Sequence, residues 1–276
     1  MVIGYLRTVH GLTVGQGCQS VGLSRAAFYR TLQAKKAGND SEVIDALNEL
    51  VARHPRWGFW KLYHGLRRQH PSWNHKRVYR IYCDLNLNQK RRAKRRIPQR
   101  ERQPLSVPPK PNETWSADFM SDALRGGTRF RTFNTIDDFN RESLVIEIDT
   151  SITAKRLIRV FERLKTERGL PNALRVDNGP EFLSAEFVSW AESHSMKIQY
   201  IQKGEPNQNA YIERFNRTYR EEVLSLYLFE DLQQVREVTY WWRLDYNERR
   251  PHDALRDRTP AECLQTAQNS TFELST

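Results

Sequence analysis

The stretch WSADFM, residues 115–120, alternates apolar and polar side chains. Trp115, Ala117 and Phe119 fall on one side of the alternation, and Asp118 falls on the other. A period of two residues is typical of a β-strand, and a proline-rich stretch precedes this one. The pattern therefore predicts the first strand of a folded core, with Asp118 held on rigid backbone.

A second carboxylate lies in RVDNGPEF, residues 175–182, where Asp177 closes a short apolar run. The Asn-Gly-Pro sequence that follows is a turn signal, so the strand is expected to stop there. Because the end of a strand faces a cleft more often than a core, we expect the Asp177 side chain to be open to a ligand.

The third carboxylate is Glu213, in NAYIERFNRTYREE, residues 209–222. Ile212, Phe215 and Tyr219 have the spacing of a buried helical stripe. The spacing leaves another face to four polar residues, which are Glu213, Asn216, Arg217 and Arg220.

Each acid alone has an ordinary explanation: a solvated strand residue, a turn former before Asn-Gly, or, for Glu213, an ion-pair partner of Arg217 one turn later. Together they indicate more. A two-metal site for phosphoryl transfer needs carboxylates from distant segments to hold two hard cations about 3.5–4 Å apart. Thirty-five residues separate Asp177 from Glu213, and carboxylate oxygens suit Mg²⁺ or Mn²⁺.

Several long motifs resemble successive blocks of the integrase-like transposases of the insertion-sequence-three family. They are WSADFMSDAL (115–124), GGTRFRTFNTIDDFNRESL (126–144), LRVDNGPEF (174–182), KGEPNQNAYIERFNRTYREEVL (203–224), DYNERRPHDAL (245–255) and TPAE (259–262). The resemblance runs from about Ile44 to Glu262. It implies an α/β fold with an RNase H-like mixed sheet flanked by helices, like the catalytic core of retroviral integrases.

The resemblance also implies a reaction: DNA strand cleavage at the ends of the element, followed by transfer of the freed 3′-hydroxyl to another strand. On this chain it assigns the Asp-Asp-Glu triad, both as catalytic residues and as ligands of two Mg²⁺ ions that Mn²⁺ can replace, to Asp118, Asp177 and Glu213. Related elements join this reading frame to a preceding one, so a fusion or partnership with that product is expected. Pairing two DNA ends implies a homo-oligomer.

Charge is distributed very unevenly along the 276 residues, whose net charge is +11. Residues 1–102 carry 21 Lys and Arg against 6 Asp and Glu, whereas residues 103–276 carry 23 against 27. A basic half is typical of a protein that binds double-stranded DNA, and an acidic half suits a metal-binding core. Basic residues that merely keep the protein soluble would not explain this segregation.

The densest basic run is KRRAKRRIPQRER, residues 90–102, with eight bases and one acid. Four prolines follow closely, so the run predicts an extended connector rather than a helix. Its expected DNA contacts are Lys90, Arg91, Arg92, Lys94, Arg95 and Arg96. Lys203, Arg217 and Arg220 are candidates beside the triad.

The first third of the sequence predicts short helices in a helix-turn-helix-like arrangement. Ser24 and Asn74 are good N-cap residues, and Ser41 is expected to cap a helix that runs through Ala52. A further helix is expected over 58–68. Lys76, Arg77 and Arg80 lie on the helix after Asn74, which makes it a candidate DNA reader; plain packing of helical hairpins is the alternative.

The pattern of the remaining sequence predicts an antiparallel meander of strands, followed by alternating helices and strands. This order is typical of a mixed sheet with helices on both faces. Strands are expected at 114–120, 128–137, 143–149, 173–177 and 197–201, and helices at 154–168, 184–194, 207–224 and about 232–246. In the last helix, Trp241 and Trp242 are expected in the core. The predicted division is a helical DNA-binding region at 1–89, a basic proline-rich linker at 90–112, the catalytic core at 113–230 and a helical extension followed by a tail at 231–276.

Other polar residues compete for roles. We expect Asp137 or Asp138 to stabilise a hairpin corner, while Glu181 and Glu222 flank the triad without a ligand role in the resemblance. Four residues after the last predicted helix are candidates for lying near DNA, namely Asn247, Arg249, Arg250 and His252.

Cysteine and histidine usage excludes several classes. Three scattered cysteines provide no disulfide framework. The paired His and paired Cys of the zinc-binding domain of retroviral integrases are absent. No apolar run approaches the length of a membrane span. These features fit a protein of the reducing cytosol, and the family resemblance implies a bacterial cytoplasmic protein associated with the nucleoid.

Two rival classes remain open. One is a DNA-binding regulator, or an inactive remnant of a transposase, in which the acids persist without metal chemistry. The other is an RNase H-like nuclease that hydrolyses strands without joining them. The helical DNA-binding units and the basic connector favour a transposase over both.

Overall fold

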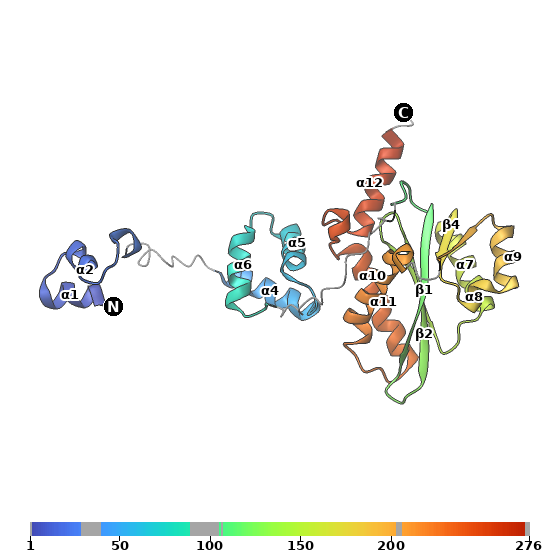
Figure 1. Ribbon diagram of the computed structural model, residues 1–276, viewed down its shortest axis with the longest axis horizontal. Coiled ribbons are helices and arrows are strands. Elements are labelled where there is room, and N and C mark those ends of the chain that lie inside the picture. Colours follow the sequence, from blue (N-terminus) through green and yellow to red (C-terminus); the bar gives the residue numbers. More distant parts are fainter. Residues whose placement is uncertain (1, 29–39, 89–104, 106, 203–205, 274–276) are drawn as a thin grey trace. The chain divides into compact units, whose positions relative to one another are not determined.

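The computed structural model describes residues 2–28, 40–88, 105, 107–202 and 206–273 (Figure 1). The chain divides into two compact units, Met1–Glu49 and Leu50–Thr276. Among the described residues, no helix combines the length and the apolar character needed to cross a membrane. The three cysteines are free, as their scatter in the sequence predicts.

The first unit contains helices α1 (Val2–His10) and α2 (Val14–Ser20). Thr13 and Gln16 cap α2 reciprocally, which satisfies two backbone donors at its start. Gly22, at φ 65°, makes the corner that follows. The Ser24 hydroxyl then accepts a hydrogen bond from the Ala27 N–H at 3.1 Å, so its predicted capping role is confirmed.

Three further helices are α4 (Ser41–Arg53), which crosses the division between the units, α5 (Phe59–Gln69) and α6 (His75–Asp84). The Asn74 side chain caps α6 by accepting from the Lys76 N–H at 2.9 Å, as predicted. The prediction for Ser41 was wrong by one residue. The Asp40 carbonyl accepts the first helical hydrogen bond, from the Ile44 N–H, so Ser41 is already inside the helix.

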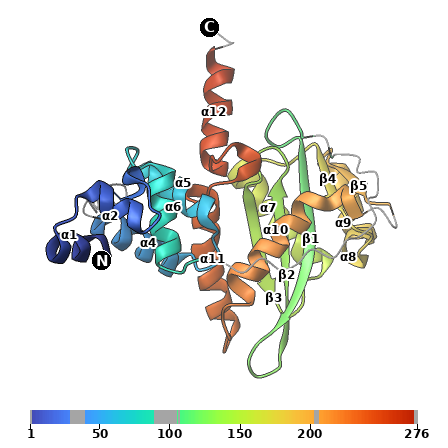
Figure 2. The ribbon, with the colours of Figure 1, turned by 60° about the vertical axis from the view of Figure 1, so that its left-hand side comes forward.

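A five-stranded mixed sheet forms the core of the second unit, in the order β3-β2-β1-β4-β5. The strands are β1 (Thr114–Ala123), β2 (Arg129–Asp137), β3 (Ser143–Asp149), β4 (Ala173–Val176) and β5 (Lys197–Tyr200). The β1-β2-β3 meander is antiparallel, whereas β4 and β5 run parallel to β1. The central strand is therefore β1, the strand that carries Asp118 (Figure 2).

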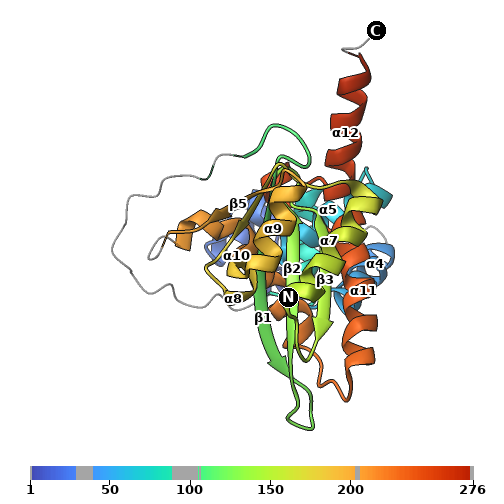
Figure 3. The ribbon, with the colours of Figure 1, turned by 90° about the vertical axis from the view of Figure 1, so that its right-hand side faces the viewer.

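Helices cover both faces of the sheet. On one face lie α7 (Ala154–Arg168), α8 (Pro180–Leu183) and α9 (Ala185–Ser193), which stand in front of the strands in Figure 3. On the other lie α10 (Ala210–Tyr219), its continuation η2 (Arg220–Leu224), which has π-helical hydrogen bonding, and α11 (Leu232–Glu248). The remaining elements are the short 3₁₀ turns η1 (Pro206–Asn209) and η3 (Asp253–Leu255), and the helix α12 (Pro260–Glu273).

The alternation in WSADFM separates two cores. Trp115 and Ala117 pack with α7 and α9 in one apolar cluster. Met120, from the opposite set, packs with Tyr219 and Val235 in a cluster on the α10–α11 side. The even-numbered positions, Asp118 among them, therefore belong to the α10 face.

The structure confirms the predicted strands and helices of the sheet to within a few residues at each end. It also corrects one expectation and adds one helix. Trp242 packs in the core, but Trp241 is 63% exposed, since only one side of α11 faces the sheet. Helix α12 was not predicted, because its sequence has no strong apolar stripe to indicate a helix.

Candidate active site

Asp118 and Asp177 lie side by side, because they occupy equivalent positions along two neighbouring segments of the sheet. Strands β1 and β4 are parallel, with Ser116 opposite Arg175. Two residues further along, Asp118 lies on β1 and Asp177 is the first residue beyond the end of β4. The strand stops at the Asn-Gly-Pro turn, as predicted, and this leaves Asp177 at the carboxyl end of β4.

Helix α10 brings Glu213 to the same strand. The Asn216 side chain donates from Nδ2 to Asp118 Oδ2 at 2.8 Å, and its own Oδ1 accepts from Asn134 Nδ2 at 2.7 Å. Asn134 is the partner of Asp118 across β1 and β2. Glu213 precedes Asn216 by three residues, so it lies one helical turn away on the same side of α10.

The electrostatics of Asp118 reflect this arrangement. The pKa of Asp118 is raised to about 6, chiefly by burial and in addition by the nearby charges of Asp177 and Glu213. Hydrogen bonds from the Phe119 N–H and the Asn216 amide oppose the rise in this pKa. The three carboxylates therefore share one electrostatic environment, in which a proton or a cation at Asp118 is favoured.

Asp177 is positioned by its own turn. Its Oδ1 accepts from the Gly179 N–H at 3.1 Å. A Cβ at position 179 would lie 3.0 Å from that oxygen, so glycine leaves the room that the turn requires. Glu213, by contrast, is exposed on α10.

The side chains do not form a ready metal cluster. In the part of the chain that the structure describes, no three His, Cys, Asp or Glu side chains are close enough to hold one ion. The donor chemistry nevertheless fits a hard divalent cation, because all three groups are carboxylates and, after burial, the charges of Asp177 and Glu213 contribute to the raised pKa of Asp118.

The residues predicted to contact DNA have different surroundings. Lys76 and Arg80 are exposed on α6, and Arg80 pairs with Asp84 at 3.6 Å. Arg77 is half-buried on the same helix. Arg217 is exposed on α10, whereas Arg220 pairs with Asp122 at 3.2 Å. Seven candidates lie outside the described residues: Lys90, Arg91, Arg92, Lys94, Arg95, Arg96 and Lys203.

The competing acids are structural. Asp137 and Asp138 are buried at the hairpin corner between β2 and β3, as expected. Asp137 accepts hydrogen bonds from the Asn112 and Phe139 N–H groups, and Asp138 pairs with Arg175 at 2.6 Å. Glu181 pairs with Arg131.

Residues after α11 also serve the fold. Asn247 exchanges hydrogen bonds with the Ser143 backbone, and Arg250 is buried in an ion pair with Glu222. Burial lowers the pKa of His252 to about 3, so this ring is neutral. Only Arg249 of the four candidates has an exposed side chain.

Asn216 is the site residue whose role sequence reasoning missed. It was placed among the polar residues of an outer face, yet it is 7% exposed and bonded to Asp118. An amide one turn after a candidate catalytic acid was the available signal, because positions i and i+3 share a side of a helix.

Replacing Asn216 with Ala is expected to destabilise the protein by roughly 1–3 kcal/mol, because the buried Asn134 amide loses its acceptor. Loss of the donor to Asp118 should also raise the pKa of that carboxyl further. Urea unfolding checks the first effect. Asn269→Ala, on the exposed side of α12, is the matched control. Equal midpoints for the two variants would contradict the proposed buried bridge.

The stability of the metal-free protein should depend on Asp118. Its pKa rises from 3.8 to about 6 on folding, so between these values the folded form holds a proton that the unfolded chain has released. Stability is therefore expected to fall, by on the order of 2 kcal/mol, as pH rises through this window. Melting curves in EDTA should show a flatter pH dependence for Asp118→Asn. Parallel curves for the two proteins would contradict this.

Comparisons with known proteins agree with the geometry. Residues 108–206 and 194–260 each match a model described as integrase core domain, and residues 39–96 match one described as HTH-like domain. An uncharacterized protein of insertion element IS407 from Burkholderia multivorans is 40% identical over 248 residues, which cover 90% of this chain and 88% of that protein.

Two further matches are more distant. Transposase InsD of an IS2 insertion element from Escherichia coli is 24% identical, over 82% of this chain and 79% of that protein. The HTLV-2 integrase catalytic core domain, solved in complex with magnesium, is 18% identical with a TM-score of 0.43, over 55% of this chain and 96% of that one. The chain thus belongs to the insertion-element transposases of the insertion-sequence-three family, polynucleotidyl transferases with an integrase core and an HTH-like N-terminal region.

Proposed function

We propose that this transposase cuts DNA strands at the ends of its insertion element and transfers each freed 3′-hydroxyl to another DNA strand, with Asp118, Asp177 and Glu213 as its catalytic residues. The observation that carries the proposal is the Asn216–Asp118 hydrogen bond. It holds the α10 turn with Glu213 against the strand with Asp118, and Asp177 directly follows the end of the adjacent strand β4.

The same three carboxylates would hold two Mg²⁺ ions, or Mn²⁺ in their place. Bound there, the ions would activate the attacking water or 3′-hydroxyl and stabilise the leaving oxygen of an in-line displacement. Glu213 is exposed, and exposed side chains change rotamer rapidly, so packing does not fix the direction of its carboxylate.

The protein residues have separate tasks in this scheme. Asn216 fixes the orientation of the Asp118 carboxylate, and the turn at Gly179 fixes that of Asp177. Because the chemistry is a direct displacement at phosphorus, the scheme contains no covalent intermediate with the protein. Burial, and then the charges of Asp177 and Glu213, raise the pKa of Asp118. Bound cations would lower that pKa, so the carboxyl is expected to give up its proton when they bind.

DNA would be bound by several segments. We assign Lys76, Arg77 and Arg80 on α6, the basic run that includes Lys90–Arg96, and Lys203, Arg217 and Arg220 near the triad to contacts with duplex phosphates. Two element ends require two active sites, which implies a homo-oligomer on DNA. We further propose a contribution from the product of the preceding reading frame, and action on the bacterial nucleoid in the cytoplasm.

The predicted division into 1–89, 90–112, 113–230 and 231–276 belongs to the same proposal. The HTH-like match at 39–96 and the integrase-core matches from 108 to 260 support the separation of a DNA-binding region from a catalytic region.

The deciding experiment incubates the full chain with labelled element-end duplex and a target duplex, with Mg²⁺ or with EDTA. Joined strands that appear only with Mg²⁺ are the expected products. Hydrolysed strands without joined ones would indicate the nuclease alternative. Duplex retained in a gel without cleavage, together with no Mg²⁺ binding by calorimetry, would indicate a regulator or an inactive remnant.

A further inference from the structure

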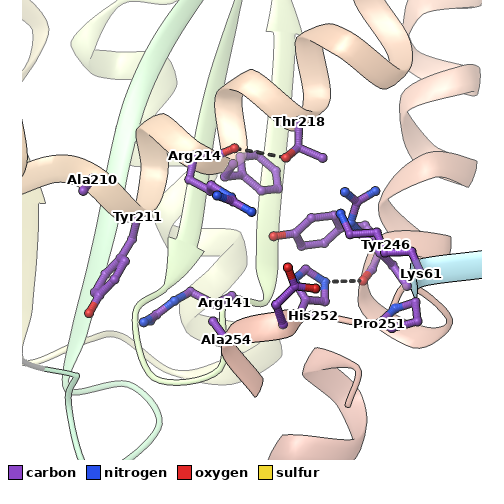
Figure 4. A pocket seen from close by; sticks show the side chains of 13 residues that line it. Lys61, Arg141, Ala210, Tyr211, Arg214, Thr218, Tyr246, Pro251, His252 and Ala254 are labelled. Carbon is purple, nitrogen blue, oxygen red and sulfur yellow. Dashed lines mark hydrogen bonds between the residues drawn. The ribbon is translucent and has the colours of Figure 1, made fainter. Parts of the chain in front are cut away.

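A pocket of about 410 Å³ opens beside α10, next to the candidate active site (Figure 4). Arg214 reaches into it from α10, while Lys61 of α5 and Arg141 of the β2–β3 turn line it from other sides. The segment with Arg250 and His252 completes the wall. None of these residues has a role in the proposed chemistry.

The pocket carries an excess of positive charge. Arg250 is compensated by Glu222, and His252 is neutral because burial lowers its pKa. Lys61, Arg141 and Arg214 have no ion-pair partner among the described residues, and Asp253 is the one acid in the described lining. Three cations without an ion-pair partner, against one acid in the described lining, indicate an anion as the ligand of the cavity.

Arg141 is held in this position by its surroundings. Its guanidinium lies 3.4 Å over the Tyr211 ring, and Nη1 is buried without a hydrogen-bond partner within the described part of the chain. The residue adopts φ 62°, a left-handed conformation that non-glycine residues rarely take. Buried donors are normally satisfied, so an orphaned guanidinium nitrogen points to a missing acceptor.

Lys61 is affected by the same environment. Burial, followed by the charge of Arg250, lowers the pKa of Lys61 to about 8. An anion in the pocket would stabilise the charged ammonium, so binding it and protonating Lys61 favour each other.

The position on α10 indicates which anion this is. Residues 210, 214 and 218 form one row at i, i+4 spacing, and Glu213 and Arg217 form the adjacent row. A DNA strand whose reacting phosphate lies at Glu213 would meet Arg217 and then Arg214 as it crosses the helix. At the pocket edge, the Tyr211 hydroxyl donates to the Leu105 carbonyl at 2.9 Å, and in the sequence Leu105 comes three residues after the end of the basic run 90–102.

We propose that this pocket binds one phosphodiester of a DNA strand that crosses α10 beside the active site, with Lys61, Arg141 and Arg214 as its ligands. The proposal rests on the proposed function. In this proposal the pocket positions the substrate strand. The triad, in contrast, contacts the reacting phosphate.

Lysine footprinting on the full wild-type chain tests this directly. At pH 8, an amine-acetylating reagent should modify Lys61 readily because its pKa is low. A saturating element-end duplex is expected to reduce the modification of Lys61 at least several-fold. Lys155, exposed on α7 across the sheet, should react equally with and without DNA. Inorganic phosphate at the same ionic strength should protect Lys61 little.

Variants supply the second measurement. The double variant Lys61→Gln, Arg214→Gln should bind duplex with a log–log salt dependence that is shallower by roughly 1, the amount expected for one lost phosphate contact. Lys155→Gln, Arg159→Gln removes two exposed charges from α7 and should leave the slope unchanged.

The outcomes separate this inference from the proposed function. If the protein joins strands but DNA does not protect Lys61 from acetylation, the phosphate-binding role of the pocket is wrong and the proposed reaction stands. Protection of Lys61 without joining would overturn the proposed reaction alone. Equal protection by inorganic phosphate would make the pocket a general anion site and would also overturn the proposal.

Discussion

Replacing Asp118 with Asn is expected to lower Mg²⁺-dependent strand joining by roughly a thousandfold or more, equivalent to a loss of about 4 kcal/mol of transition-state stabilisation. The substitution keeps the shape of the side chain, and the one remaining oxygen can still accept from Asn216 Nδ2, although the side chain can no longer accept from both Asn216 and the Phe119 N–H. It removes the negative charge and one cation ligand from the centre of the site. Asp177→Asn and Glu213→Gln remove the other two ligands and should have effects of the same order.

Two controls make this loss specific. Glu186→Gln, an acid-to-amide change at an exposed position of α9, should join strands at the wild-type rate. The three triad variants should still retain duplex DNA in a gel, because the proposed DNA contacts lie on other residues. Normal joining by any one of them would remove that residue from the active site.

The second large effect is on stability. Glu222→Ala is expected to destabilise the protein by about 3–5 kcal/mol, because it leaves the Arg250 guanidinium buried without its counter-ion. Arg250 is 5% exposed, and Glu222 also accepts from Trp242 Nε1 at 3.0 Å. Glu222 belongs to the π-helical continuation of α10, so loss of the pair should loosen the helix that carries Glu213.

Urea unfolding measures this effect, and an exposed ion pair provides the control. Glu230→Ala breaks the ion pair between Glu230, whose side chain is 54% exposed, and Arg125, whose side chain is 68% exposed. This substitution should lower the free energy of unfolding by about 0–1 kcal/mol. Replacing Glu222 and Arg250 together, by Leu and Met, should recover most of the loss, since no buried charge remains. A cost for Glu222→Ala as small as that for Glu230→Ala would mean that water solvates Arg250.

Much of the candidate site was predictable because its parts carry local patterns. The period of two in WSADFM placed Asp118 on a strand, and the stripe of Ile212, Phe215 and Tyr219 placed Glu213 on a helix. Both elements formed as predicted. The exposed Trp241 was misplaced, since the two tryptophans of α11 are adjacent and only one can face the sheet.

Sequence alone determined the order of strands and helices, the two-sided alternation of β1, the turn after Asp177 and the family, because these depend on short-range periodicity and on motifs. Only the tertiary structure decided that Asn216 bonds Asp118, that burial raises the pKa of this carboxyl, and that Arg141 and Arg214 share a pocket. These features depend on packing between segments far apart in the chain. Desolvation and charge pairing act through space, and no local pattern of residues encodes them.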